Sequence, residues 1–412
     1  MVVRPFRGLR PRKDMIDKVA AKPYDVVSTE EARKEAERNP YTFYKVTRPE
    51  INFDGEVDTH SDEVILKGKE VLENFQKEGV MILEDKPAIY VYKEEWKGYS
   101  QIGIYATFST QEYREGKIKK HELTRKDKED ERARHVKLMQ AHTGPVFLMY
   151  RSRPEIDQLI IKHTTKEPEY DYTDESGIHH TLWVVKDENE IKEIVDAFKS
   201  VDAFYIADGH HRAAAAARAA EELAKENPNH TGEEEYNFFL AVLFPHSQLH
   251  ILDYNRVVKD LNGNSKEEFL KKISAKFDIE DAPNSPFKPE KKHEFGMYLD
   301  GKWYKLSAKE GTFDKNDVVS SLDVAILQNN LLNPILGIEN PRTDKRINFV
   351  GGIKGVEELQ RLVDSGEYTV AFALYPTSIE ELLQVADEGK IMPPKSTWFE
   401  PKLKSGIIVH LM

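Results

Sequence analysis

Reactive side chains are concentrated between residues 203 and 220, in the sequence AFYIADGHHRAAAAARAA. The apolar beginning of this segment predicts a β-strand, and its alanine-rich end predicts an α-helix. The turn between them carries a carboxylate, a glycine, two imidazoles and a guanidinium, at Asp208, Gly209, His210, His211 and Arg212. The first turn of a helix presents unpaired N–H groups and the positive end of the helix dipole. The pattern therefore predicts an anion site, with phosphate as the expected anion.

Each side chain of this turn has a chemistry that suits a phosphate ligand. Gly209 permits a close approach of the backbone to the ligand. Arg212 can hold a phosphate through two hydrogen bonds, and a histidine can donate a hydrogen bond, transfer a proton or bind a metal. Asp208 also stands where a helix N-cap residue belongs, so capping is its alternative role. The sequence leaves open which of His210 and His211 faces the site.

A second candidate group begins the charged segment 117–134, KIKKHELTRKDKEDERAR. Most of these charges are typical of a solvated loop and helix with ion pairs between residues four apart. The front of the segment differs, because Glu122 follows Lys120 and His121 and lies close to Arg125. A glutamate held near phosphate-binding cations is a natural general base for a hydroxyl. Glu122 is therefore a candidate base, and Arg125 a candidate phosphate ligand.

A third candidate is the loop near the C-terminus in which two prolines precede Lys395, Ser396 and Thr397. The prolines stiffen the backbone, while the ammonium, the hydroxyls and the main-chain N–H groups could cradle a phosphate. The loop is not a P-loop, because the glycines of that motif are missing. Its alternative is an ordinary surface loop.

The N-terminal segment RPFRGLRP is a fourth candidate, because Arg4 and Arg7 lie among prolines and could reach a carboxylate or phosphate of a substrate. The alternative is an arm that docks by packing Phe6 and Leu9.

The neighbouring histidines His179 and His180 are of a residue type that binds metals. We expect both to lie exposed in a polar loop instead.

The elements that must position these side chains alternate along the chain. We expect the following helices: Ser28 or Thr29 to Arg38, Asp62–Glu78, Lys126–Gln140, Glu155–His163, Glu188–Lys199, Ser265–Phe277, Ser321–Leu332, and one ending at Asp387 that begins at a capping box, Thr377-Ser378-Ile379-Glu380. We expect strands at Ala88–Tyr92, Gln101–Phe108, Val146–Tyr150, Thr181–Val185, Phe238–Phe244, Glu294–Leu299, Lys302–Leu306 and Tyr368–Leu374. This alternation predicts a mixed α/β fold around a partly parallel sheet.

Composition narrows the class of protein. A chain of 412 residues is long enough for two or three domains. Its net charge of −12 argues against broad nucleic-acid binding. The absence of cysteine excludes disulfides, zinc–thiolate sites and cysteine nucleophiles. Neither an apolar signal core nor a long apolar run stands out, so we expect a cytoplasmic protein with no membrane partner.

The motifs together resemble a widespread prokaryotic family, through RPFRGLRP, PYDVV at 23–27, KHELTR at 120–125, ADGHHR at 207–212, NFVGG at 348–352 and MPPKSTWFEPK at 392–402. The ADGHHR segment is similar to the phosphate-binding motif of the ParB/sulfiredoxin superfamily. Within that superfamily the free L-serine kinases also combine a His-Glu pair with a following Asp-Gly-His-His-Arg. The resemblance implies a ParB/sulfiredoxin-like core at 111–250 between an α/β region at 1–110 and another at 251–412, whose tail, 392–410, returns toward the site.

The resemblance also implies transfer of a phosphoryl group from ATP, ADP or pyrophosphate to the hydroxyl of free L-serine. Carried over by position, Glu122 matches the general base, and Asp208 matches the acidic residue that binds Mg²⁺ or assists deprotonation. Gly209, His210, His211 and Arg212 match the phosphate-binding turn, with His210 counted among the catalytic residues. Closure of Lys395, Ser396 and Thr397 over the bound molecules would complete the site.

Two other classes of function remain open from the sequence. ParB-like folds also hydrolyse nucleotides, so the chain could be a nucleotide hydrolase or a nucleotide-gated switch. It could also be a regulator that binds a nucleotide or an amino acid without turnover. Phosphate release without an acceptor would favour the first class, and tight binding without turnover would favour the second.

Overall fold

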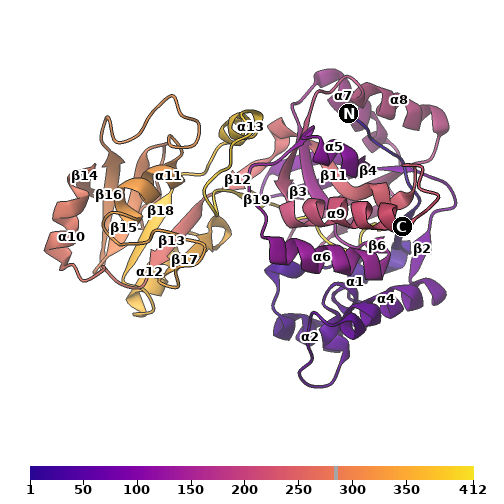
Figure 1. Cartoon of the computed structure of the whole chain (residues 1–412), viewed down its shortest axis with the longest axis horizontal. Coiled ribbons are helices and arrows are strands. Elements are labelled where there is room, and N and C mark those ends of the chain that lie inside the picture. Colours follow the sequence, from indigo (N-terminus) through magenta and orange to yellow (C-terminus); the bar gives the residue numbers. More distant parts are fainter. Residues whose placement is uncertain (283–285) are drawn as a thin grey trace. The chain divides into compact units, whose positions relative to one another are not determined.

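The computed structural model describes residues 1–282 and 286–412, which divide into two compact units. Unit 1 comprises Met1–Leu249 and Pro401–Met412, and unit 2 comprises His250–Glu400. Figure 1 shows that both units combine sheets with helices, so the fold is mixed α/β, as the sequence predicted. Strands from both of the first two expected segments, 1–110 and 111–250, pair within one sheet of unit 1. The division into three segments stays a prediction.

The main sheet of unit 1 has eight strands. Their order across the sheet is β5 (Ile118–Lys119), β10 (Phe204–Asp208), β7 (Val146–Tyr150), β11 (Phe238–Pro245), β4 (Tyr99–Ser109), β3 (Ile89–Trp96), β9 (His179–Val185) and β8 (Tyr170–Thr173). The pairs β5–β10 and β7–β11 are parallel, and the other neighbours are antiparallel. Strands β7 and β11 are buried along their whole length, which explains their continuous apolar sequences.

A smaller sheet of unit 1 joins the two ends of the chain. Its order is β2 (Met81–Leu83), β1 (Gly8–Pro11), β20 (Val409–Leu411) and β6 (Ala141–His142). Strand β20 pairs with β1 on one side and with β6 on the other. The last twelve residues are therefore part of unit 1, although the preceding 151 residues form unit 2.

Nine α-helices accompany these sheets within the described part of unit 1. They are α1 (Ile16–Val19), α2 (Thr29–Arg38), α3 (Tyr44–Thr47), α4 (Asp62–Lys77), α5 (Thr110–Arg114), α6 (Lys126–Met139), α7 (Pro154–Ile161), α8 (Glu188–Phe198) and α9 (His210–Glu226). Ser28 begins α2 with a complete capping box to Glu31, as its sequence indicated. Helices α6 and α9 run side by side (Figure 1), because Ala133, Ala215 and Ala219 are small enough to let the two backbones approach closely.

Unit 2 is built on a six-stranded antiparallel sheet. Its order is β14 (Phe277–Asp281), β16 (Lys302–Ala308), β15 (Glu294–Leu299), β18 (Val370–Leu374), β13 (Tyr254–Val258) and β17 (Ile347–Gly351). Strands β12 (His250–Leu252) and β19 (Trp398–Glu400) form a separate pair. The α-helices of its described residues are α10 (Lys266–Ile273), α11 (Asp323–Leu327), α12 (Val356–Asp364) and α13 (Ile379–Asp387). Leu359 and Val356 of α12 pack with Val257 and Ala371 in the core of this unit.

Several sequence-based expectations need correction. The helix expected to reach Phe277 ends at Ile273, because Phe277 begins strand β14. The helix expected over Ser321–Leu332 is α-helical only to Leu327 and continues as a π-helical turn.

The capping box of α13 joins Ser378 to Glu381 rather than Thr377 to Glu380, so the helix begins one residue later than expected. His179 and His180 lie on strand β9, and His180 is buried instead of exposed.

No helix among residues 1–282 and 286–412 has both the length and the apolar composition needed to span a bilayer.

Candidate functional site

Parallel pairing of β5 with β10 brings the two candidate motifs to one edge of the sheet. Ile118 is aligned with Phe204, and Lys119 with Tyr205. Parallel strands end at the same edge, so the residues that follow each strand meet there. The residues after β5 are KHELTR at 120–125, and the end of β10 carries Asp208 and the turn into α9. One strand pairing thus brings together two motifs that lie far apart in the sequence.

The turn from β10 into α9 depends on Gly209. Its φ of 90° lies in the left-handed region, which favours glycine. A β-carbon at this position would also come within 3.2 Å of the Arg212 guanidinium. Gly209 is itself the N-cap residue, and no side chain among the described residues caps α9. The capping role considered for Asp208 is therefore wrong, and the first N–H groups of α9 remain available to an anion.

His210 is the histidine that faces the KHELTR segment. Its side chain is only 5% exposed, and its ring packs edge-on against His121 with centroids 4.4 Å apart. Its Nε2 accepts a hydrogen bond from the backbone N–H of His121 at 3.4 Å, which leaves the proton of the neutral ring on Nδ1. That Nδ1 lies 3.9 Å from Oε2 of Glu122. Burial is the main cause that lowers the pKa of His210 well below its ordinary value, so the ring is neutral near pH 7.

Asp208 is an ionised carboxylate paired with a lysine from the end of the chain. Its Oδ2 lies 3.3 Å from Nζ of Lys402. Burial by itself raises the pKa of Asp208, but the positive charges of Lys402 and Arg212 outweigh it and hold the pKa well below its ordinary value. A carboxylate that stays charged over the whole physiological range can hold a cation or accept a hydrogen bond from a substrate.

Arg212 points away from the Glu122 side of the turn. Its Nη1 donates a hydrogen bond to the carbonyl of Pro145, and its Nη2 lies 4.0 Å from Oδ2 of Asp25. Burial tends to lower the pKa of Arg212, but the charges of Asp25 and Asp208 raise it, so the group is a permanent cation. Because His210 and Arg212 leave opposite faces of α9, the turn presents an imidazole on one side and a guanidinium on the other.

His211 and Arg125 meet through the backbone rather than through their charges. The backbone N–H of Arg125 donates to Nε2 of His211 at 3.3 Å. The Arg125 guanidinium is exposed and forms an ion pair with Asp127 at 2.6 Å. Partial burial lowers the pKa of His211. This contact fixes the end of the KHELTR loop on the first turn of α9.

A small concave pocket continues from Arg212. Its lining includes Tyr24, Arg132, His135, His142, Thr143, Gly144 and Ser405. The Arg132 guanidinium lies over the Tyr24 ring, 3.5 Å from its centroid. The Nε2 atoms of His135 and His142 are buried in this lining without a hydrogen-bond partner in the described part of the chain. Unpaired polar atoms beside two guanidinium groups suit a polar, anionic ligand.

The two N-terminal arginines are held at other places in unit 1. Arg4 forms an ion pair with Glu235 at 3.0 Å and lies over the ring of Phe238, beside a different pocket. Arg7 is exposed, and its Nε donates to the carbonyl of Glu84 at 2.7 Å. Phe6 and Leu9 are buried, so the segment is a docked arm. A substrate-binding role of Arg4 and Arg7 stays a prediction.

Lys395, Ser396 and Thr397 belong to unit 2. Lys395 has a φ of 58°, and its ammonium lies 5.8 Å from the centroid of the Tyr254 ring. Ser396 is buried, and its hydroxyl donates to the carbonyl of Pro393 at 2.6 Å. The loop is therefore folded onto its own unit, and its closure over a phosphate stays a prediction.

Sequence reasoning missed two charged partners of the turn. Lys402, beside Asp208, and Asp25, beside Arg212, both lie in segments that carry the family resemblance, MPPKSTWFEPK and PYDVV. Their presence in these segments was the one feature of the sequence that could have marked them as candidates. The pairing itself could not be read, because neither residue is near the turn in sequence.

Among the described residues, no three side chains of the types His, Cys, Asp and Glu are grouped so that they could hold a metal ion. Mg²⁺ does not need such a cage, because it commonly keeps water and uses one or two carboxylates together with substrate phosphates. The ionised Asp208 fits the part of such a carboxylate. The Asp208 carboxylate would then contact both the Lys402 ammonium and the Mg²⁺ ion.

A family model for proteins described as "Protein of unknown function (DUF1015)" matches residues 3–325, which is more than half of the chain. The chain belongs to this family. No curated protein matches it. The matched region contains the KHELTR and ADGHHR segments.

Solved structures similar to this DUF1015 chain share little sequence with it. A free serine kinase in complex with AMP is 13% identical, with a TM-score of 0.37, and the match covers 72% of this chain and 86% of that one. A conserved hypothetical protein from Pyrococcus furiosus is 15% identical, with a TM-score of 0.37 and coverages of 74% and 95%. SbnI from Staphylococcus aureus with a C-terminal truncation is 10% identical, with a TM-score of 0.36 and coverages of 73% and 85%. With TM-scores below 0.5, none of these likenesses carries a conclusion about this chain.

Proposed function

We propose that this DUF1015 chain is a phosphotransferase that moves a phosphoryl group from a nucleotide or pyrophosphate to the hydroxyl of free L-serine, giving O-phospho-L-serine. The observation that carries the proposal is the approach of Glu122 to His210 at the uncapped N-terminus of α9, which begins directly after Asp208 and Gly209. Phosphoryl transfer depends mainly on positioning and charge neutralisation, and this turn offers both.

Glu122 is the proposed general base. Its carboxylate takes the proton of the serine hydroxyl while the hydroxyl oxygen forms a bond to the transferred phosphorus. The bond from phosphorus to the bridging oxygen of the donor breaks, and the leaving ADP, AMP or phosphate takes the electron pair. His210, with its Nδ1 3.9 Å from Glu122, is placed to orient that carboxylate as the substrate binds.

The other side of the turn would hold the donor phosphates. The N–H groups at the start of α9 and the Arg212 guanidinium, which lies against Gly209, provide donors. The pocket that continues from Arg212, with its two unpaired histidine nitrogens, is the proposed place for the rest of the donor. Mg²⁺ bound with the donor would neutralise phosphate charge, and Asp208 is the carboxylate placed to hold it.

The direct test is incubation of the folded wild-type chain with L-serine, Mg²⁺ and ATP, ADP or pyrophosphate in turn, followed by mass spectrometry of the amino acid. We expect O-phospho-L-serine with at least one donor, and loss of at least 99% of its formation in Asp208→Asn. Absence of the product with all three donors would contradict the proposal. Phosphate release without serine would favour a nucleotide hydrolase, and tight donor binding without turnover would favour a regulator.

A further inference from the structure

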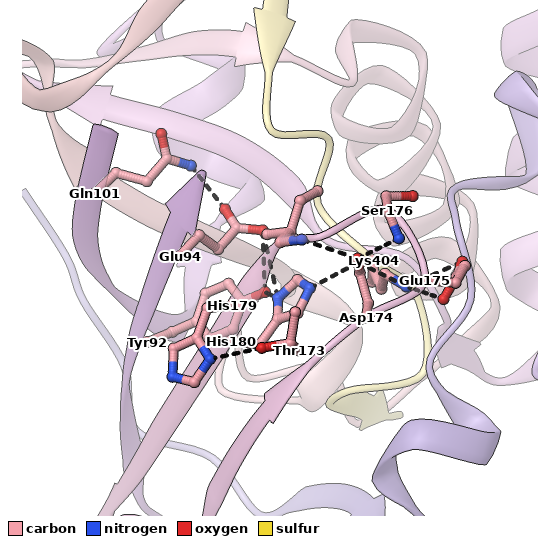
Figure 2. Close-up of polar contacts among 11 residues, drawn as sticks. Tyr92, Glu94, Gln101, Thr173, Asp174, Glu175, Ser176, His179, His180 and Lys404 are labelled. Atoms are coloured by element: carbon pink, nitrogen blue, oxygen red, sulfur yellow. Dashed lines mark hydrogen bonds and ion pairs between the residues drawn. The ribbon is translucent and has the colours of Figure 1, made fainter. Parts of the chain in front are cut away.

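A buried charged network lies in unit 1 outside the Asp208 turn. Figure 2 shows it extending from Lys404 in the last twelve residues to strands β9, β3 and β4 of the main sheet. Its side chains join in the order Lys404, Asp174, His180, Tyr92, Glu94 and Gln101.

The ion pair between Lys404 and Asp174 is the link to the C-terminal segment. Nζ of Lys404 lies 2.9 Å from Oδ2 of Asp174, and the two side chains are only 3% and 1% exposed. Lys404 also reaches Glu175, at 3.4 Å, which lies at the surface. A lysine buried to this degree is costly to leave unpaired, so the position of Asp174 determines where Lys404 can lie.

The remainder of the network fixes Asp174. The other contact of its Oδ2 is with Nε2 of His180 at 2.9 Å, while Nδ1 of that ring lies 2.7 Å from the hydroxyl of Tyr92. The Tyr92 hydroxyl also contacts Glu94 at 3.1 Å, and the Gln101 amide donates to the second oxygen of Glu94 at 2.7 Å. Each polar group thus has a partner on a neighbouring strand, which gives the network one defined geometry.

Only one residue separates Lys404 from Lys402, the partner of Asp208. Leu403 between them is buried, and Ser405 exchanges backbone hydrogen bonds with Ala21 at 2.8 and 3.0 Å. A chain can span at most about 7 Å over two residues, so fixing Lys404 restricts Lys402 to the vicinity of Asp208. Within this segment Lys404 therefore pairs with Asp174, whereas Lys402 pairs with Asp208 at the turn into α9.

We propose that Asp174 and Lys404 are positioning residues, whose buried ion pair anchors the segment at 401–405 so that Lys402 is held beside Asp208. The consequence for anion binding rests on the proposed function. Held there, the Lys402 ammonium adds to the positive potential at the turn that receives a phosphate. Asp174 acts on the site through Lys402 and does not touch a ligand.

The test is a double-mutant cycle with pyrophosphate binding, measured by titration calorimetry. Asp174→Asn should weaken binding about tenfold in the wild-type chain and less than twofold in the Lys402→Met background. If the ion pair did not position Lys402, removing a negative charge would leave binding unchanged or strengthen it in both backgrounds. The matched control is Asp171→Asn on the same hairpin, whose ion pair with His179 is exposed, and its affinity should stay within twofold of the wild type.

Amide hydrogen exchange tests the anchor without a ligand. In Asp174→Asn the Ser405 amide should exchange at least tenfold faster, while the amides of the β20–β1 pairing keep their wild-type rates. Unchanged exchange at Ser405, or equal acceleration across unit 1, would overturn the proposal. If the wild-type chain bound no pyrophosphate, that result would count against the proposed function. The exchange rate of the Ser405 amide would still test whether the Asp174–Lys404 ion pair anchors the segment.

Discussion

At the scale of single residues, buried neutral imidazoles make the stability of this protein sensitive to acid. Burial lowers the pKa of His121 to about 4 and that of His142 to about 3. In the unfolded chain both should titrate near 6.5, so between these values the unfolded state binds more protons than the folded one. The stabilisation is complete above about pH 6.5 and is lost as the pH falls toward the folded values.

We therefore expect His142→Gln to reduce the pH dependence of stability between pH 6 and pH 4.5. One fewer neutral imidazole should lower the slope of the unfolding free energy by about 1.4 kcal/mol per pH unit. Urea unfolding of both chains at several pH values measures the two slopes. Equal slopes would show that His142 is protonated in the folded state.

The residue types of the turn were readable from the sequence, but their partners were not. Four reactive residues and a glycine in a row at Asp208–Arg212 indicated an anion site, and the structure has no side-chain cap at the start of α9. The choice of His210 over His211 needed the fold, since it depends on which ring packs against His121. His180 was wrongly expected to be exposed, because its two partners, Asp174 and Tyr92, come from other segments.

At the scale of elements, α9 must sit close to α6 for the turn to meet the KHELTR loop. Ala215 is fully buried between the two helices, in a cluster with Ala133 and Ala219. We expect Ala219→Leu, in the same cluster, to lower the free energy of unfolding by about 1–3 kcal/mol, since the added carbon atoms would have to fit between closely packed helices. Lys225→Leu, on an exposed position of the same helix, should change it by less than about 0.5 kcal/mol. Denaturant unfolding of the two variants makes the comparison, and equal stabilities would contradict this view of the helix contact.

Elements with strong local signals were predicted best. Strand β7 was predicted with both its ends, and α2 and α4 were predicted to within a residue or two, because apolar runs and capping serines mark them. Strand β5 is two residues long and lies in a charged segment, so no periodicity could identify it. That short strand is nevertheless the element that brings Glu122 to the turn.

At the scale of the whole molecule, the proposed site is formed by segments that meet only in the folded chain. The proposed site takes Glu122 from the end of β5, Asp208 and His210 from the turn after β10, and Lys402 from the last twelve residues. Motif content indicated which segments matter. Their contacts result from strand pairing and buried ion pairs between distant parts of the sequence, which local patterns do not encode.

The most direct test of Glu122 as the base is the steady-state rate of L-serine phosphorylation by Glu122→Gln. We expect kcat to fall by about 10²–10⁴-fold, because the hydroxyl loses its base, while KM for the donor changes by less than about threefold. Glu115→Gln, an exposed glutamate before β5, should keep the wild-type rate. A Glu122→Gln chain whose kcat stays within threefold of the wild type would contradict the assignment of this residue as the base of a phosphotransfer site.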